Sequence, residues 1–169
     1  AFIKKITFIG DKKIKQNKLK KIIVSEEDKF WKFLSTRRYL DLNRIKFDEK
    51  LLYNFYKNKG YYNVSVESSS AKVIDESNFE LIFNINAGKK YYFGKIDLII
   101  PNEYSPESFQ KIVDTQDELE GKIYSFDKIK KILNKIDEIA LTKEFEFINA
   151  KYKEDIINNN INLVIKLEE

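Results

Sequence analysis

One order of predicted elements, strand-helix-helix-strand-strand, occurs twice in this chain of 169 residues, with a period of roughly 80 residues. The predicted elements of the first half are a strand over Phe2–Ile9, a short helix at Leu19–Ile23, a longer helix over Asp48–Lys59, and strands over Tyr62–Val66 and Phe79–Asn86. Those of the second half are a strand over Tyr92–Ile100, a helix after Ser105, a long helix after Ser125, and strands over Phe145–Tyr152 and Ile161–Leu167.

The longer helix of each half is the most regular part of the pattern. In the first half, Asp48 is a candidate N-cap and Gly60 a candidate stop, because glycine adopts the left-handed conformation without steric cost. Ser125 is the corresponding candidate cap in the second half. The residues between these signals place apolar side chains on one stripe, as a helix packed on a sheet requires.

A strand-helix-helix-strand-strand unit forms a three-stranded sheet with two helices on one face, which is enough to bury a thin core. We therefore predict an α+β protein with two such domains, each containing a mixed sheet. The turn-forming residues near Gly88 separate the repeats. The predicted domains are residues 1–90 and 91–169.

Composition argues against catalysis. The chain has no histidine and no cysteine, which removes the commonest general base, the thiolate nucleophile and the soft metal ligands. We expect no enzyme activity, no cofactor and no metal site. The net charge of +4 is spread among interspersed acids and lysines, which does not favour nucleic-acid binding. There is no methionine and no run of about 20 apolar residues, so we expect a soluble fragment or processed chain.

The predicted sheet itself offers a binding site. If the strand order is first, third, second, the second strand has one neighbour, and an extended peptide can pair with its free side. The candidate edge residues are Tyr62, Asn63, Val64, Ser65, Val66, Glu67 and Ser68 in the first unit, and Phe145, Glu146, Phe147, Ile148 and Asn149, continuing to Tyr152, in the second. The alternative is a solvated edge, because charges such as Glu67 and Lys151 also protect edges from aggregation.

An aromatic stretch, Phe30-Trp31-Lys32-Phe33, lies between the two helices of the first half. It has two interpretations: the rings dock a partner helix, or most of them pack in the core. The second is the commoner use of such residues, so we expect most of the rings to be buried. Trp31 is the candidate contact for a partner.

Three motifs and one insertion in this order resemble POTRA domains of the BamA family of outer-membrane protein assembly factors. The motifs are Ile6–Asp11, for a strand followed by a turn, Leu52–Tyr61, for a helix ending in Tyr-x-x-x-Gly-Tyr, and Phe79–Tyr92, for a closing strand that leads into the next domain. The insertion that carries Trp31 and Arg38-Tyr39 is similar to one in the third POTRA domain, which makes the second half the fourth. Asp11, where the family has asparagine, and Glu144-Phe145, where it has Gly-aromatic, depart from the pattern.

The resemblance implies a scaffold on the periplasmic side of a bacterial outer membrane. Its implied partners are unfolded outer-membrane proteins, accessory lipoproteins, further POTRA domains and a C-terminal β-barrel in the full-length protein. Nucleic acid is not among them.

Two alternatives to this assignment remain at the level of sequence. One is a POTRA pair from a related transporter, of the two-partner secretion or translocation-assembly type. The other is a KH-like nucleic-acid-binding module, which shares the element order but clamps its ligand with a Gly-x-x-Gly loop. None of the five glycines is three residues from another.

Overall fold

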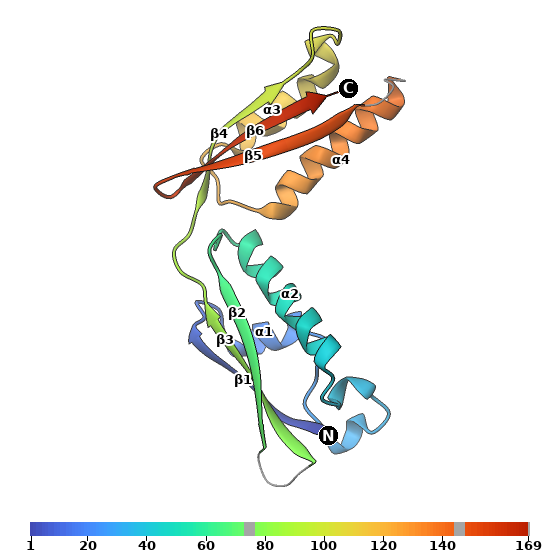
Figure 1. Cartoon of the computed structure of the whole chain (residues 1–169), viewed down its shortest axis with the longest axis vertical. Helices are drawn as coiled ribbons and strands as arrows, with labels where there is room; N and C mark the ends of the chain where they lie inside the picture. The colour runs from blue at the N-terminus through green and yellow to red at the C-terminus, as the bar shows by residue number, and fades with distance from the viewer. Residues whose placement is uncertain (73–76, 144–147, 169) are drawn as a thin grey trace. The chain divides into compact units, whose positions relative to one another are not determined.

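The structure is a computed structural model and describes residues 1–72, 77–143 and 148–168. The chain divides into two compact units. The first comprises Ala1–Lys57 and Asn63–Gly88, and the second comprises Asn58–Tyr62 and Lys89–Glu169. Each unit has the predicted α+β architecture, with helices on one face of a three-stranded mixed sheet (Figure 1).

The first unit contains the predicted elements and two additional short helical turns. Its elements are β1 (Phe2–Asp11), α1 (Gln16–Ile22), the 3-10 turns η1 (Phe30–Lys32) and η2 (Thr36–Arg38), α2 (Leu42–Asn58), β2 (Ser65–Lys72) and β3 (Asn78–Asn86). The second unit contains β4 (Tyr92–Ile99), the 3-10 turn η3 (Pro106–Phe109), α3 (Gln110–Leu119), α4 (Phe126–Thr142), β5 (Asn149–Ile157) and β6 (Asn160–Glu168).

The two sheets share one topology. The strand orders are β1-β3-β2 and β4-β6-β5, so the last strand of each unit lies in the centre. β1 pairs with β3, and β4 with β6, in parallel, whereas β2 and β5 pair with the central strand in antiparallel fashion. The predicted order, in which the second strand has one neighbour, is confirmed.

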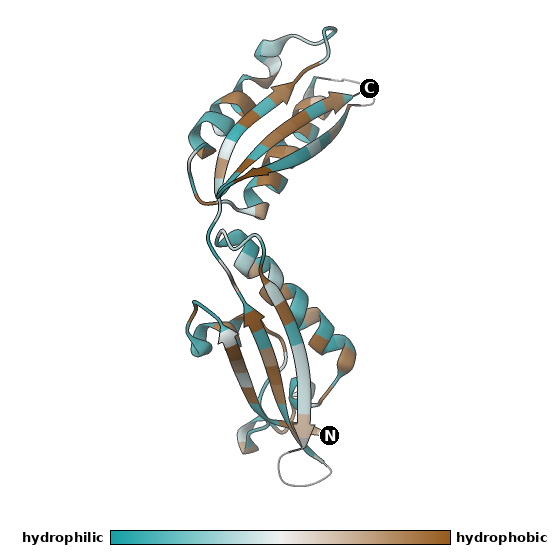
Figure 2. Cartoon of the chain, turned by 60° about the vertical axis from the view of Figure 1, so that its left-hand side comes forward, coloured by the Kyte–Doolittle hydropathy of each residue, from teal (hydrophilic) through white to brown (hydrophobic). Residues whose placement is uncertain are grey.

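Apolar residues of the central strands form the middle of each core. Leu81, Phe83 and Ile85 of β3 are fully buried, because alternate residues of a strand point to the same face. Figure 2 shows β3 mostly in the hydrophobic colour and its neighbour β2 much paler. In the second unit Leu163 and Ile165 of β6 occupy the corresponding positions.

The start of α2 differs from the prediction. The helix begins at Leu42, six residues before Asp48, because Asp41 caps it: the backbone N–H of Arg44 donates to Asp41 Oδ1 at 3.0 Å. Asp48 is instead a buried residue in the helix, with no exposed surface. The predicted stop is confirmed, since α2 ends at Asn58 and Gly60 has a φ of +93°.

Gly10 allows β1 to lie close to β3. Its φ is +92°, and a Cβ atom at this position would lie 2.3 Å from the carbonyl oxygen of Ile85. A side chain would therefore push the two strands apart. The glycine of the predicted strand-then-turn motif has its physical explanation in this contact.

Candidate functional site

The outer edges of β1 and β4 are covered by the protein's own backbone. Beside β1, the N–H of Asp28 donates to the carbonyl of Ile3 at 2.6 Å, and the N–H of Leu40 donates to that of Ala1 at 3.0 Å. Beside β4, the N–H of Gly121 donates to the carbonyl of Phe93 at 2.8 Å. Neither of these edges has room for a further strand at these positions.

The outer edge of β2 is open. Among the described residues, the backbone of Ser65–Lys72 bonds only to β3, so its outward N–H and C=O groups have no protein partner. The edge runs over eight residues and contains no proline, so it can offer a continuous set of donors and acceptors. This is the free strand edge that the sequence predicted.

The position of this edge requires a correction. Ser65, Val66, Glu67 and Ser68 lie on β2, but Tyr62, Asn63 and Val64 precede it. The reason is local: the N–H of Tyr62 donates back to the carbonyl of Gly60 at 3.0 Å, which makes a turn. The apparent alternation of Tyr62 with Val64 and Val66 therefore crosses from a turn into a strand.

Tyr62 contributes to the second unit, to which the segment Asn58–Tyr62 belongs. Its ring packs against Tyr91 and Tyr124, with ring centroids 5.7 and 5.1 Å away. The hydroxyl groups of Tyr62 and Tyr124 both donate to the carboxylate of Glu154. Burial and this carboxylate raise the pKa of Tyr124. Tyr62 is a packing residue here and not part of a free edge.

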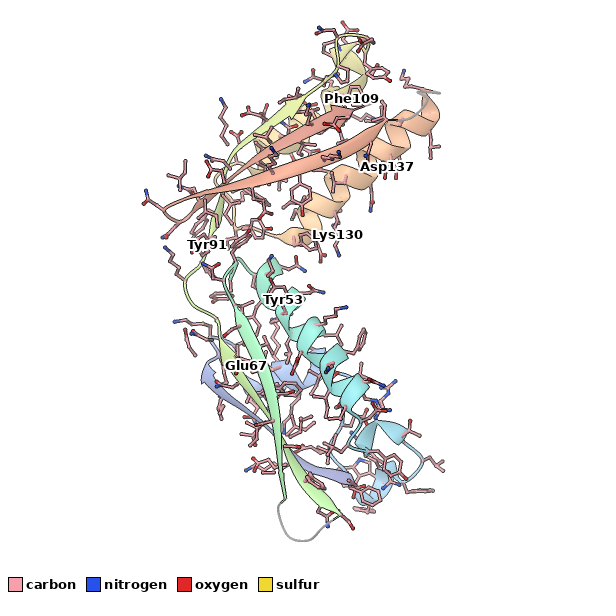
Figure 3. All side chains as sticks on the ribbon, viewed as in Figure 1. Tyr53, Glu67, Tyr91, Phe109, Lys130 and Asp137 are labelled. Carbon is pink, nitrogen blue, oxygen red and sulfur yellow. The ribbon has the colours of Figure 1, made fainter. Side chains whose placement is uncertain are left out.

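The side chains of β2 are small. Ser65, Ser69, Ser70 and Ala71 are exposed, and none of them is large enough to obstruct a neighbouring chain. Among the described side chains of the strand, Glu67 is the one charged group (Figure 3). Natural edges are commonly protected by lysine or proline; β2 contains no proline, and its one lysine is Lys72, the last residue of the strand.

The corresponding edge of the second unit is β5. Phe145, Glu146 and Phe147 lie outside the described residues, Ile148 precedes the strand, and Asn149 is its first residue. Among the described residues, β5 pairs only with β6. It differs from β2 in its exposed lysines, including Lys151 and Lys153. Because such charges hinder strand addition, β2 is the better candidate for peptide binding.

Four apolar side chains project from the connection between α1 and α2. We call Phe30, Trp31, Phe33 and Leu34 the aromatic segment; their exposed fractions are 87%, 62%, 67% and 85%. The expectation that most of these rings are buried was wrong. They lie in and beside the short turn η1, and Phe30 and Trp31 pack edge to face on each other, with centroids 4.9 Å apart.

The aromatic segment is held in place by charged residues on either side of it. Asp28 forms ion pairs with Lys4 at 2.7 Å and with Arg38 at 2.8 Å. Arg38 also donates to the carbonyl oxygen of Phe33 at 3.0 Å and lies over the ring of Phe2, 4.8 Å from its centroid. The rings are exposed on a backbone that is fixed at both ends.

Asp48 anchors the start of the same connection. Its carboxylate accepts the backbone N–H groups of Val24 at 2.6 Å and Ser25 at 3.2 Å. The roles of Asp48 and Arg38 were not predicted from the sequence. A signal for Asp48 was present, since an acid at this position faces inward on a helix whose stripe includes Leu52.

Acid is expected to loosen the aromatic segment. Hydrogen bonds from Lys4 and Arg38 lower the pKa of the Asp28 carboxyl. A carboxyl with a lowered folded-state pKa contributes stabilisation that is complete above its ordinary pKa of about 4 and is lost as the pH falls through the lowered value. Amide spectra of residues 28–39 should therefore change in acid and not between pH 7 and pH 5.

The control for this prediction is Asp28→Asn, which keeps the shape and removes the charge. Its amide spectrum at pH 7 should already show the loosened segment, with a smaller change on acidification. Spectra of the unmodified chain that stay constant down to pH 2 would contradict the assigned role of Asp28.

In the part of the chain that the structure describes, no group of three or more histidine, cysteine or acidic residues could hold a metal ion. No helix of the described residues is long and apolar enough to cross a membrane.

These features define a class of protein: a repeated α+β module with an open strand edge and an exposed apolar segment. The chain belongs to the POTRA family, whose model, described as surface antigen variable number repeat, matches residues 1–88.

One curated relative is similar over part of its length. The outer membrane protein assembly factor BamA of Neorickettsia risticii (strain Illinois) is 29% identical over 97 residues, which are 57% of this chain and 13% of the relative. The match therefore covers about an eighth of the relative's length.

Solved structures of POTRA domains share the fold. The BamA POTRA3-5 structure from Haemophilus influenzae has a TM-score of 0.67 and 15% identity, covering 99% of this chain and 61% of that one. BamA from Haemophilus ducreyi lacking POTRA domains 1-3 has a TM-score of 0.66 and 13% identity, covering 100% and 29%. POTRA1-2 of Omp85 from Anabaena has a TM-score of 0.56 and 10% identity, covering 98% and 94%.

Proposed function

We propose that this chain is a periplasmic scaffold of a bacterial outer-membrane protein assembly machinery, which binds unfolded outer-membrane proteins by β-augmentation and catalyses no reaction. The family and the named relative support the cellular role. The observation that carries the binding mechanism is the open outer edge of β2.

β-Augmentation suits varied clients. An added strand gains its affinity from main-chain hydrogen bonds, which every client sequence offers except at proline. The small side chains of β2 leave this backbone accessible, and they impose little selection on the client. Strands of outer-membrane proteins alternate apolar and polar residues. This is the sequence pattern of an extended strand, the conformation that pairs with a sheet edge.

The proposal includes the wider assignment made from sequence. The two units correspond to the third and fourth POTRA domains, the full-length protein carries further POTRA domains and a C-terminal β-barrel, and accessory lipoproteins are partners. β5 is the weaker second edge. Trp31 marks a separate contact surface.

A titration tests the edge directly. The probe is a ten-residue peptide with the alternating apolar and polar pattern of a barrel strand, added to the isotopically labelled 169-residue chain. We expect the largest amide shifts at Ser65–Ala71 and smaller ones along β3. Shifts confined to the helix surfaces, with β2 unchanged, would refute binding at this edge.

Proline substitutions identify the donors. Successive N–H groups of an edge strand alternate between the partner strand and the free side, so one of Ser69→Pro and Ser70→Pro removes an outward N–H and the other breaks the ladder to β3. The variant that removes the outward N–H should keep its melting temperature within a few degrees. It should bind the peptide about tenfold more weakly, because one hydrogen bond to the peptide is lost and the proline ring obstructs the edge.

Lys153→Pro on β5 is the matched control. It changes the edge that we consider protected, so it should leave peptide binding at β2 unchanged. Equal loss of binding in the β2 and β5 variants would show that the two edges are equivalent.

A further inference from the structure

The aromatic segment exposes a contiguous group of large apolar side chains. Isolated exposed apolar residues are common, but a contiguous group of large ones marks an interaction site. The four side chains lie within five consecutive positions, each more than half exposed. Their backbone is fixed by Asp28 and Arg38, so the exposure belongs to an ordered conformation.

Positive charge surrounds this apolar group. The carboxylates of Glu26, Glu27 and Asp28 form ion pairs with five basic side chains: Lys4, Lys20, Lys32, Arg37 and Arg38. Lys29, beside Phe30, adds a further exposed cation. The base of the aromatic segment therefore has a surplus of positive charge, which complements an anionic surface.

The segment is also small and projecting. A stable protein interface needs roughly 20–30 residues on each side, far more than one short connection supplies. Trp31 does border a hollow, but its volume is only about 170 Å³ and much of its wall consists of charged side chains. The apolar side chains are largely exposed to solvent, so they suit insertion into a soft surface better than docking into a rigid one.

We propose that the aromatic segment inserts into the headgroup region of an anionic lipid bilayer, with Phe30, Trp31, Phe33 and Leu34 below the phosphates and the basic side chains at their level. Tryptophan and phenylalanine favour this interfacial zone, and lysine or arginine near an anionic membrane adds attraction that falls with salt. The lipid contact gives a partner to the surface that Trp31 marks in the proposed function. It rests on the proposed function for its cellular setting only.

Trp31 is the chain's single tryptophan, so its fluorescence reports this site alone. The probe is the 169-residue chain titrated with vesicles of phosphatidylethanolamine containing 30% phosphatidylglycerol, and with vesicles of phosphatidylcholine as the neutral comparison. About one lipid in three is then anionic, which gives the vesicle surface the negative potential that attracts basic segments. Emission should move to shorter wavelength with the anionic vesicles, and the shift should shrink as salt is raised.

Variants separate the apolar and charged contributions. Phe30→Ser with Phe33→Ser should weaken partitioning at least about tenfold, since each ring loses its transfer out of water. Lys29→Glu should weaken binding to anionic vesicles and leave the weak binding to neutral ones unchanged. Leu141→Ser is the matched control, because Leu141 is also 81% exposed but lies on α4; it should bind as the unmodified chain does.

Each outcome bears on this proposal separately from the peptide edge. Trp31 emission that is unchanged by every vesicle composition overturns the lipid contact, while peptide shifts at β2 can still support the proposed function. A shift produced by a purified accessory lipoprotein and not by vesicles also overturns it, in favour of a protein partner. Vesicle binding without peptide shifts at β2 would support the lipid contact and count against β-augmentation.

Discussion

Replacing Asp48 with alanine is expected to lower the free energy of unfolding of the first unit by about 3 kcal/mol. The carboxylate is completely buried and accepts the N–H groups of Val24 and Ser25. Its removal takes away the partner of a buried donor at Ser25 and of a partly buried donor at Val24, and a buried donor left without a partner costs about 1–3 kcal/mol. Denaturant unfolding followed by circular dichroism measures the change.

Asp48→Asn separates hydrogen bonding from packing. The amide oxygen can keep one of the two N–H groups, but the amide nitrogen cannot accept the other. We therefore expect a smaller loss than for alanine. An alanine variant as stable as the unmodified chain would show that the two N–H groups find other partners, and the anchor assigned to α2 would be wrong.

Replacing Phe83 with alanine is expected to cost the first unit about 3–5 kcal/mol. Phe83 lies on the central strand β3 with no exposed surface, and its ring stacks on that of Phe8 with centroids 5.4 Å apart. The substitution removes apolar contacts and leaves a cavity between the sheet and its helices. Thermal and denaturant unfolding should both show the loss.

Phe83→Leu is the control for this substitution. It preserves most of the buried apolar volume, so its cost should be well below that of alanine. Amide exchange should locate the alanine effect at the first unit, around β1 and β3. If the alanine and leucine variants unfold at the same denaturant concentration, Phe83 is not part of a close-packed core.

The sequence predicted the order of helices and strands because glycine stops and apolar alternation mark these elements locally. Gly60 marked the end of α2, and the apolar alternation of Phe79–Asn86 identified the central strand β3. The strand order taken as the premise for a free edge is also the one observed, and it leaves the outer edge of β2 unpaired. The end of α2 and the alternation of β3 depend on short-range patterns, which a single sequence displays.

The errors arose where distant contacts decide the structure. Asp48 looked like a helix cap, but its partners lie on the connection after α1, more than 20 residues earlier. Trp31 and its neighbours looked like core residues, but the space inside the first unit is filled by others, including Leu19 and Leu52. Alternation at Tyr62 suggested a strand, whereas its ring packs with residues of the second unit.

The parallel pairing of β1 with β3 has a consequence for biogenesis. β1 is the first element of its unit and its parallel partner β3 is the last, so Phe2 can pair with Asn78 only after the whole unit has been synthesised. Contacts between such distant positions form late and slowly during folding. Until β3 emerges, the apolar side of β1 has no sheet to join, and the nascent domain is exposed to aggregation in this interval. Holding chaperones should therefore matter most while this unit is still incomplete.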